Sequence, residues 1–202
     1  MSPSPSSFTT LGTAGGPILT ATRSQPAHLI MNGDQPVLVD CGEGALGQLA
    51  KVGIGVKDLD QVFITHHHFD HIGDLFALLG LCVMIQRKQP LTIYGPRNTK
   101  SIIDNLIAAC EPSRSLGFGV SGQKLPAISG FLQVIELEPG SEVKLDGMTV
   151  RCCENTHFSS AEDGSAEAVS LAYRFDLADR AILFTGDSGP SKNMEALGKG
   201  VD

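Results

Sequence analysis

The sequence has 202 residues, enough for one large domain or two small ones with a buried core. Hydrophobic residues make up 42% of it, Gly occurs 23 times and Trp is absent, a composition that excludes disordered and fibrous classes. The formal charge is -7 and the 15 Lys and Arg residues form no long run. This argues against a surface built to hold a polyanion, so nucleic acid is not the partner that we expect.

Nothing in the sequence points to a membrane or to an oxidising compartment. No stretch approaches the roughly 18 consecutive apolar residues that span a membrane. The N-terminal segment has no Lys or Arg before Arg23 and no clean apolar run, which is unlike a signal peptide. The five cysteines are odd in number and lack C-x-x-C spacing, a pattern typical of small buried residues in a reducing environment. The sequence therefore favours a cytoplasmic protein.

The first part of the chain predicts strands punctuated by turns. The first seven residues are rich in Ser and Pro, and we expect them to be disordered. Apolar segments bounded by Gly and Pro then predict strands at 8–12, 27–32 and 36–40. A helix is expected over 44–53, because its apolar residues have helical spacing and Gly53 can cap it. The nearly all-apolar segment 61–65 is typical of a strand covered on both faces.

The rest of the chain predicts two helices and then a strand-rich half. The segment 72–88 is apolar nearly all round and predicts a largely buried helix. After a strand at 91–96, a helix is expected to begin at Asn98 and to end at Pro112. A Gly- and Ser-rich loop follows, and then come strands and a short final helix, predicted at 131–138, 141–145, 148–155, 168–175, 181–187 and 191–200. This order favours two sheets packed face to face with helices outside, in a single domain covering 1–202.

Four of the six histidines fall within the segment THHHFDH, directly after a predicted buried strand. Residues i and i+2 of an extended chain point the same way, so His66 and His68 are expected to converge while His67 points elsewhere. Asp70 and His71 follow the turn into a helix and can face a second point. Imidazole and carboxylate groups gathered in this way are what a pair of divalent metal ions needs. A surface histidine run or a tag fits poorly between two apolar segments.

The same segment resembles the H-x-H-x-D-H signature of the metallo-β-lactamase superfamily. Other segments resemble the branch of that superfamily that contains ribonuclease Z and arylsulfatase-like enzymes: LGTAGG at 11–16, VDCGEG at 39–44, YGP at 94–96, NTHFSS at 155–160 and ILFTGDSGP at 182–190. The resemblance covers about residues 8–190. It implies an α+β fold, the αββα sandwich, in which two mixed sheets pack face to face with helices outside and the metal ions lie at one edge.

The resemblance implies a site for two divalent ions, with Zn²⁺ expected and Mn²⁺ or Fe as alternatives. The first ion is held by His66, His68 and His157, the second by Asp70 and His71, with Asp187 bridging the two. His67 and His28 match no ligand position, and we expect a structural role for His28.

One departure from the family pattern concerns the second ion. The family has a further histidine ligand some tens of residues after the bridging aspartate, and this sequence has no histidine after His157. We therefore expect either a chain that lacks the family's C-terminal strand and helix or a second ion that binds weakly or not at all.

These expectations point to a hydrolase. A water shared by two metal ions has its pKa lowered from about 15.7 to about 7, which gives hydroxide at neutral pH. Asp70 is expected to be the catalytic residue that holds or accepts the proton of this nucleophile. The substrate that we expect is a small ester: a sulfate ester, a phosphodiester or phosphotriester, or a lactone.

Two alternatives stay open at this point. The first is a ribonuclease Z-like endonuclease that processes RNA 3′ ends. Enzymes of that kind grip transfer RNA with a long basic arm, and the 158–186 segment between His157 and Asp187 leaves no room for one. The second is a catalytically inert metal-binding module, if the chain is truncated. The resemblance also allows a homodimer.

Overall fold

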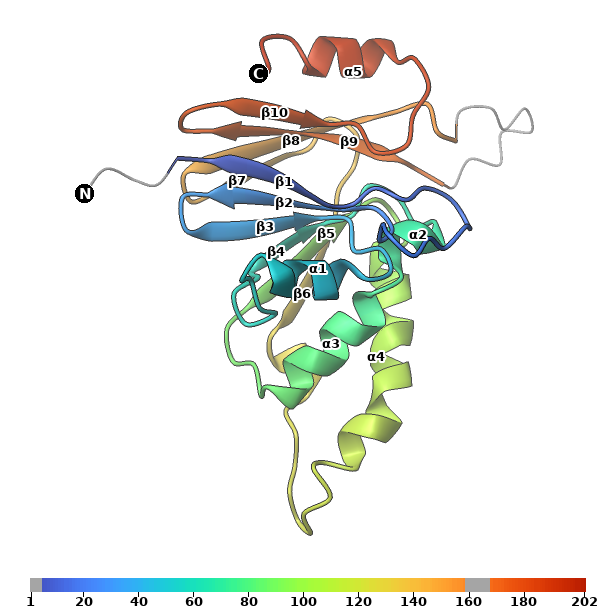
Figure 1. The fold of residues 1–202 in the computed structure, drawn as a ribbon, viewed down its shortest axis with the longest axis vertical. Helices are drawn as coiled ribbons and strands as arrows, with labels where there is room; N and C mark the ends of the chain where they lie inside the picture. The colour runs from blue at the N-terminus through green and yellow to red at the C-terminus, as the bar shows by residue number, and fades with distance from the viewer. Residues whose placement is uncertain (1–4, 159–167) are drawn as a thin grey trace.

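The computed structural model describes residues 5–158 and 168–202 and contains two β-sheets (Figure 1). The six-stranded sheet has the order β1–β2–β3–β4–β5–β6, with strands Ser7–Gly12, Ala27–Asn32, Gln35–Val39, Gln61–Phe63, Leu91–Gly95 and Leu132–Glu136. The first three of these strands are antiparallel, and β3 to β6 are parallel. The four-stranded sheet is antiparallel, in the order β10–β9–β8–β7, with β7 at Glu142–Leu145, β8 at Met148–Glu154, β9 at Leu171–Leu177 and β10 at Ala181–Phe184.

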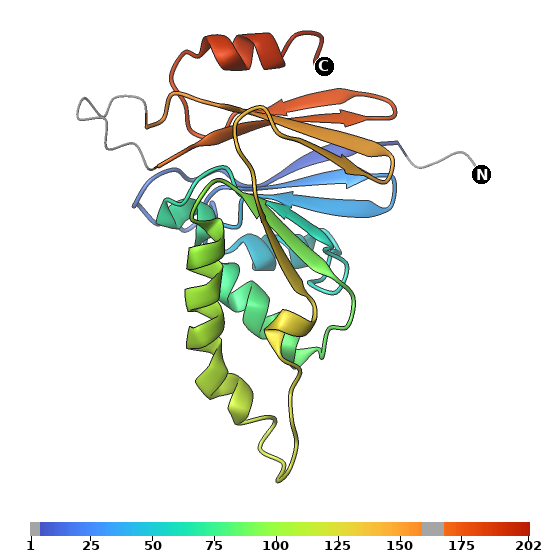
Figure 2. The ribbon, with the colours of Figure 1, turned by 180° about the vertical axis from the view of Figure 1, so that it is seen from behind.

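Helices cover the outer faces of the two sheets (Figures 1 and 2). Against the six-stranded sheet lie α1 (Ala45–Lys51), α3 (Leu75–Met84) and α4 (Thr99–Ser115), and α5 (Lys192–Leu197) lies over the four-stranded sheet. The short α2 (Phe69–Ile72) follows β4, and a 3₁₀ turn, η1 (Ile128–Gly130), precedes β6. This αββα sandwich confirms the predicted fold class.

The six-stranded sheet has a hydrophobic core on each face. In β3, Leu38 packs into the core beneath the helices, whereas its neighbour Val37 packs into the core between the sheets. Phe63 at the end of β4 lies in the core between the sheets, with its ring centroid 4.5 Å from that of Tyr94 and 5.4 Å from that of Tyr173. Burial on both faces explains why these strands are uninterrupted apolar runs in the sequence.

The prediction that Pro112 ends α4 was wrong, because the helix continues to Ser115. Proline breaks a helix because it lacks an N–H group and clashes with the preceding turn. Pro112 lies in the last turn of α4, which hydrogen bonds of Arg114 stabilise. The Nε of Arg114 donates to Glu111 at 2.7 Å, and its Nη1 donates to the carbonyl of Leu125 at 2.7 Å.

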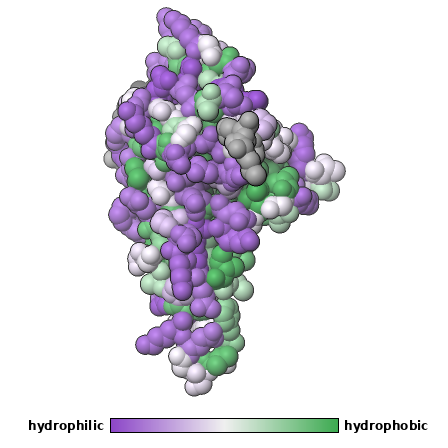
Figure 3. Space-filling view, turned by 90° about the vertical axis from the view of Figure 1, so that its left-hand side faces the viewer, coloured by the Kyte–Doolittle hydropathy of each residue, from purple (hydrophilic) through white to green (hydrophobic). Residues whose placement is uncertain are grey.

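The prediction of a largely buried α3 holds for one face only. Leu75, Leu78 and Leu79 are buried, whereas Phe76 is 46% exposed and Met84 is 56% exposed. The exposed residues border a groove that α3 shares with α4 and the loop after it, so that α4 does not cover this side of α3. Figure 3 shows hydrophobic side chains exposed on the lower half of one face, the half in which Figure 1 places the helical layer.

The N-terminal segment is structured earlier than predicted. Ser7 is the first residue of β1, and Ser6 is buried with its N–H group 3.2 Å from Oδ2 of Asp179. The predicted disorder of residues 1–7 is therefore wrong for these two residues, and residues 1–4 lie outside the described part. All five cysteines are free and four of them are buried. In the described ranges, no helix combines the length and apolar character that crossing a membrane requires.

Candidate metal centre

The end of β4 places the histidine segment at one edge of the sheet. After Phe63 the chain stays extended, with the N–H group of Ile64 bonded to the carbonyl of Tyr94 at 2.8 Å. His68 is still extended (φ -63°, ψ 145°) and is the N-cap residue of α2. This geometry confirms that His66 and His68 point to the same side, as their i, i+2 spacing predicted.

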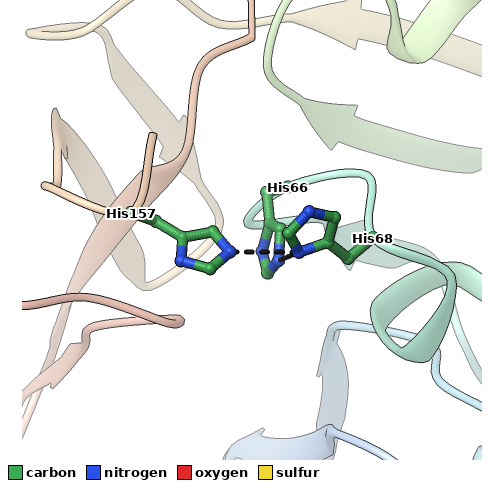
Figure 4. Close-up of side chains that lie close together, drawn as sticks. All are labelled: His66, His68 and His157. Atoms are coloured by element: carbon green, nitrogen blue, oxygen red, sulfur yellow. Dashed lines mark hydrogen bonds between the residues drawn. The ribbon is translucent and has the colours of Figure 1, made fainter. Parts of the chain in front are cut away.

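Three imidazoles converge on one point (Figure 4). Nε2 of His66 lies 3.1 Å from Nδ1 of His68, and Nε2 of His157 lies 3.0 Å from the same Nδ1. His157 comes from the segment after β8, so each of the two sheets contributes to the cluster. Three imidazole nitrogens that face one point form a donor set suited to Zn²⁺.

A second group of ligand-type atoms adjoins the first. Nε2 of His71 lies 3.6 Å from Oδ1 of Asp187 and 3.8 Å from Oδ2 of Asp70. His66, His71 and Asp187 offer ligand atoms that all lie within 4.8 Å of one another. The structure therefore brings together all six residues that the sequence predicted as metal ligands.

Asp40 is a site residue that the sequence reasoning missed. It is completely buried after β3, with a left-handed backbone (φ 59°) that is uncommon outside glycine. Its Oδ2 lies 2.8 Å from Nδ1 of His71, and its Oδ1 accepts the backbone N–H of Thr65 at 2.8 Å. A signal was present in the sequence, since Asp40 directly follows an apolar strand that pairs with β4, but its partners become visible only when the two strands are placed side by side.

Asp40 sets the tautomers of two histidines. A carboxylate only accepts hydrogen bonds, so Nδ1 of His71 carries a proton toward Asp40, and Nε2 is the nitrogen that faces the site. The hydroxyl of Thr65, 2.9 Å from Oδ2 of Asp40, donates to that carboxylate and can accept a bond from Nδ1 of His66 at 3.0 Å. Nε2 of His66 is thereby left free to act as a ligand. Carboxylate partners of this kind commonly orient metal-binding histidines.

The surroundings of His66 and His71 shift the pKa values of these two rings in opposite directions. Burial, followed by the neighbouring histidines, lowers the pKa of His66 to about 2, so this ring is neutral and has a free lone pair. Burial also opposes charge on His71, but the hydrogen bond and negative charge of Asp40, together with Asp187 and Asp70, raise its pKa. Nε2 of His71 is buried and has no hydrogen-bond partner in the described residues. A buried nitrogen that faces two carboxylates fits a metal ion at this point.

A cleft of about 530 Å³ opens over the cluster. It is lined by Gly16, Pro17, Gln25, His68, Phe69, Asp70, His157 and Asp187. The backbone N–H of Gly16 donates to Oδ2 of Asp70 at 2.9 Å, so the loop after β1 holds this carboxylate in place. Asp187 is 48% exposed at its side chain and is accessible to a molecule in the cleft.

The two remaining histidines lie outside both groups. Nε2 of His67 is 2.8 Å from Oγ1 of Thr99 at the start of α4. His28 lies between the ring of Phe8, at 5.6 Å, and the ring of Phe184, at 4.5 Å. Neither placement adds a ligand to the groups described above, and a structural role was expected for His28.

Comparison with known proteins identifies the family. Residues 6–198 match the family model described as "Anti-Pycsar protein Apyc1". The chain is 31% identical over 195 residues to ribonuclease Z of Mycobacterium sp. (strain KMS) and 28% identical over 198 residues to that of Mycobacterium bovis (strain BCG / Pasteur 1173P2). These alignments cover 96% of the chain but only 65% and 67% of the two relatives.

Solved structures agree on the fold. Human tRNase Z, short form (ELAC1), superimposes with a TM-score of 0.69 at 24% identity, over 94% of this chain and 73% of that one. The metallo-β-lactamase fold protein YhfI of Bacillus subtilis gives a TM-score of 0.68 at 20% identity, over 93% of this chain and 64% of that one. The chain therefore belongs to the Apyc1 family and has the metallo-β-lactamase fold.

Proposed function

We propose that this chain is a metal-dependent hydrolase of phosphodiesters. The observation that carries the proposal is the convergence of His66, His68 and His157 with His71, Asp70 and Asp187 beneath one cleft. Nε2 of His71 is buried and accepts or donates no hydrogen bond within the described ranges, which supports a second ion beside the first. When bound, two divalent ions would supply hydroxide at neutral pH and stabilise negative charge that develops on the phosphoryl oxygens.

The protein's own residues have distinct roles in this scheme. The three histidines of the first group and His71 would hold the ions with neutral nitrogens. Asp70, fixed by the N–H group of Gly16, would hold the proton of the nucleophile. Asp40 would act through His71 and Thr65, because it orients them and does not itself line the cleft. Asp187 would bridge the ions at the open side of the site.

The names of the relatives favour one class of ester as the substrate. The curated relatives are named ribonuclease Z, and a ribonuclease cleaves the phosphodiester bonds of RNA. Among the esters that the sequence allowed, this favours a phosphodiester over a sulfate ester, a phosphotriester or a lactone. The acidic charge and the short 158–186 segment favour a small phosphodiester over a polynucleotide. RNA 3′ processing is the second candidate, which the names of the relatives favour.

A substrate panel tests the proposal. Protein loaded with Zn²⁺ or Mn²⁺ is assayed with bis(p-nitrophenyl) phosphate, p-nitrophenyl sulfate, a chromogenic phosphotriester, a lactone and a precursor transfer RNA. We expect turnover to be fastest with the phosphodiester. Faster cleavage of the precursor RNA, at a rate that falls steeply with added salt, would favour the second candidate. Metal binding without turnover of any substrate would favour the inert module.

Asp70→Ala is the decisive variant in this assay. We expect it to abolish turnover while the protein stays folded by circular dichroism. Asp104→Ala is the matched control, because Asp104 is exposed on α4 and its side chain forms an ion pair with Lys100. If Asp70→Ala retained the activity of the Asp104→Ala control, the proposed role of this carboxylate would be refuted.

A further inference from the structure

Phe69 has the most exposed large hydrophobic side chain in the described residues, at 89%. An isolated exposed phenylalanine needs no explanation in itself. The position of Phe69 is unusual, because its neighbours in sequence are His68 and Asp70. Phe69 lines the cleft over the candidate metal centre together with these two residues.

The backbone that carries Phe69 is firmly held. The N–H group of His71 bonds to the carbonyl of His68 at 2.9 Å, and the N–H group of Cys41 bonds to the carbonyl of His71 at 2.8 Å. Gly42 packs so closely that a Cβ atom there would lie 2.1 Å from the carbonyl oxygen of Asp70. The backbone of Phe69 therefore has a fixed position relative to the proposed metal ligands, although the side chain is mostly exposed.

The residues that line the cleft are of different chemical kinds. His68, His157, Asp70 and Asp187 carry groups that suit metal ions and a phosphoryl group. Phe69 and Pro17 add apolar surface to the same lining. The described lining residues include no Lys or Arg that would favour a second anionic group. A flat, uncharged ring attached to the phosphoryl group would gain most from this surface, because aromatic rings stack on one another when water is displaced.

From this arrangement we infer that Phe69 is a specificity-determining residue, which stacks on a flat aromatic group, such as a nucleobase, carried by the phosphodiester. The inference rests on the proposed function, which places the phosphoryl group at the metal centre. It assigns a role to a side chain that the metal-ligand set leaves unexplained.

Binding measurements test the inference without turnover. Zinc-loaded protein is titrated in a calorimeter with thymidine 5′-monophosphate and, separately, with inorganic phosphate. We expect Phe69→Ala to weaken binding of the nucleotide about tenfold or more and to change binding of phosphate by less than about twofold. Phe69→Trp should keep the wild-type preference for the nucleotide, because the larger ring still stacks. Phe76→Ala removes an exposed ring outside the cleft and should leave the affinity for both ligands unchanged.

Three results would overturn the inference. Wild-type protein could bind the nucleotide no more tightly than phosphate. Phe69→Ala could leave the preference for the nucleotide unchanged. Phe69→Ala could also weaken the binding of nucleotide and phosphate equally. That result would indicate a structural effect on His68 and Asp70, the neighbouring residues proposed to bind metal.

Turnover assays separate this inference from the proposed function. Thymidine 5′-(p-nitrophenyl phosphate) and methyl p-nitrophenyl phosphate share a leaving group and differ in the nucleoside. We expect Phe69→Ala to raise KM for the first substrate alone and to leave kcat for the second unchanged. If the wild-type protein hydrolysed neither but kept the binding difference, the proposed function would fail and the role of Phe69 would stand. If Phe69→Ala changed KM equally for both substrates, the role of Phe69 would fail and the phosphodiesterase would stand.

Discussion

Nδ1 of His71 lies 2.8 Å from Oδ2 of Asp40, a carboxylate with no exposed surface. Asp40 thereby joins the end of β3 to the metal centre that is built around the end of β4. The same carboxylate accepts hydrogen bonds from both the N–H group and the hydroxyl of Thr65, which precedes His66 in the sequence. The orientation of two proposed histidine ligands thus depends on one residue that does not line the cleft.

Replacement of Asp40 should weaken metal binding without removing a ligand. Asp40→Asn keeps the size of the side chain and tolerates the left-handed backbone, but it replaces an acceptor oxygen with an NH₂ group. We expect zinc affinity, measured by competition with a chromogenic chelator, to fall about 10–100-fold. The exposed Asp146→Asn provides the control. Equal affinities in the two variants would show that Asp40 does not orient the ligands.

Neighbouring histidines should respond differently to substitution. His68→Ala removes a ligand nitrogen and should lower the metal content of the purified protein. His67→Ala removes only the bond to Thr99 at the start of α4, so it should keep the metal and lower the free energy of unfolding by about 0.5–1.5 kcal/mol. Metal analysis and urea unfolding measure the two effects. A loss of metal in His67→Ala as large as that in His68→Ala would contradict the assignment.

The close approach of Gly42 to α2 predicts a sensitive position. An added Cβ atom at Gly42 would lie 2.1 Å from the carbonyl of Asp70 and 2.8 Å from that of Pro26, and these backbone groups would have to move. We expect Gly42→Ala to lower the free energy of unfolding by at least about 1–3 kcal/mol and to lower the metal content as well.

Gly47→Ala is the matched control for that variant. Gly47 lies within α1, and a Cβ atom there would meet nothing within 4 Å. This substitution should stabilise the protein by about 0.5–1 kcal/mol, because alanine loses less backbone entropy in a helix. Thermal unfolding compares the two, and equal stability would be evidence against the tight packing at Gly42.

Removal of metal should lower the melting temperature. A ligand that binds only the folded state at about 100 times its Kd stabilises it by about 2.7 kcal/mol, which corresponds to roughly 5–10 °C for a chain of this size. His157 lies after β8 and His66 after β4, so the ion would also tie the two sheets together. The chelator effect should become smaller in His157→Ala, which removes a proposed ligand of the first ion only. A wild-type melting curve that did not respond to chelator or to added Zn²⁺ would contradict the metal site.

Local sequence pattern predicted the parts of this site that depend on neighbouring residues. The i, i+2 spacing of His66 and His68 after an apolar strand was enough to predict their convergence, because an extended backbone has a period of two. His157 and Asp187 were predicted from the family resemblance alone, since nothing local in the sequence places them beside positions some 90 to 120 residues earlier.

The remaining differences come from tertiary contacts. Asp40 was missed because an aspartate after a strand is also a common turn residue, and its role depends on β3 pairing with β4. Pro112 was read as a helix end, but Arg114 bonds to Glu111 and Leu125 and supports the final turn of α4. The single domain, the homodimer and the cytoplasmic location stay predictions.

Anomalous diffraction from zinc-loaded crystals, recorded at the zinc absorption edge, tests the central claim most directly. We expect a strong peak about 2.0–2.1 Å from Nε2 of His66, Nδ1 of His68 and Nε2 of His157, and a second, weaker peak beside Nε2 of His71. Zinc peaks found only elsewhere on the protein, with these imidazoles still hydrogen-bonded to one another, would contradict the proposed metal centre and the proposed function that depends on it.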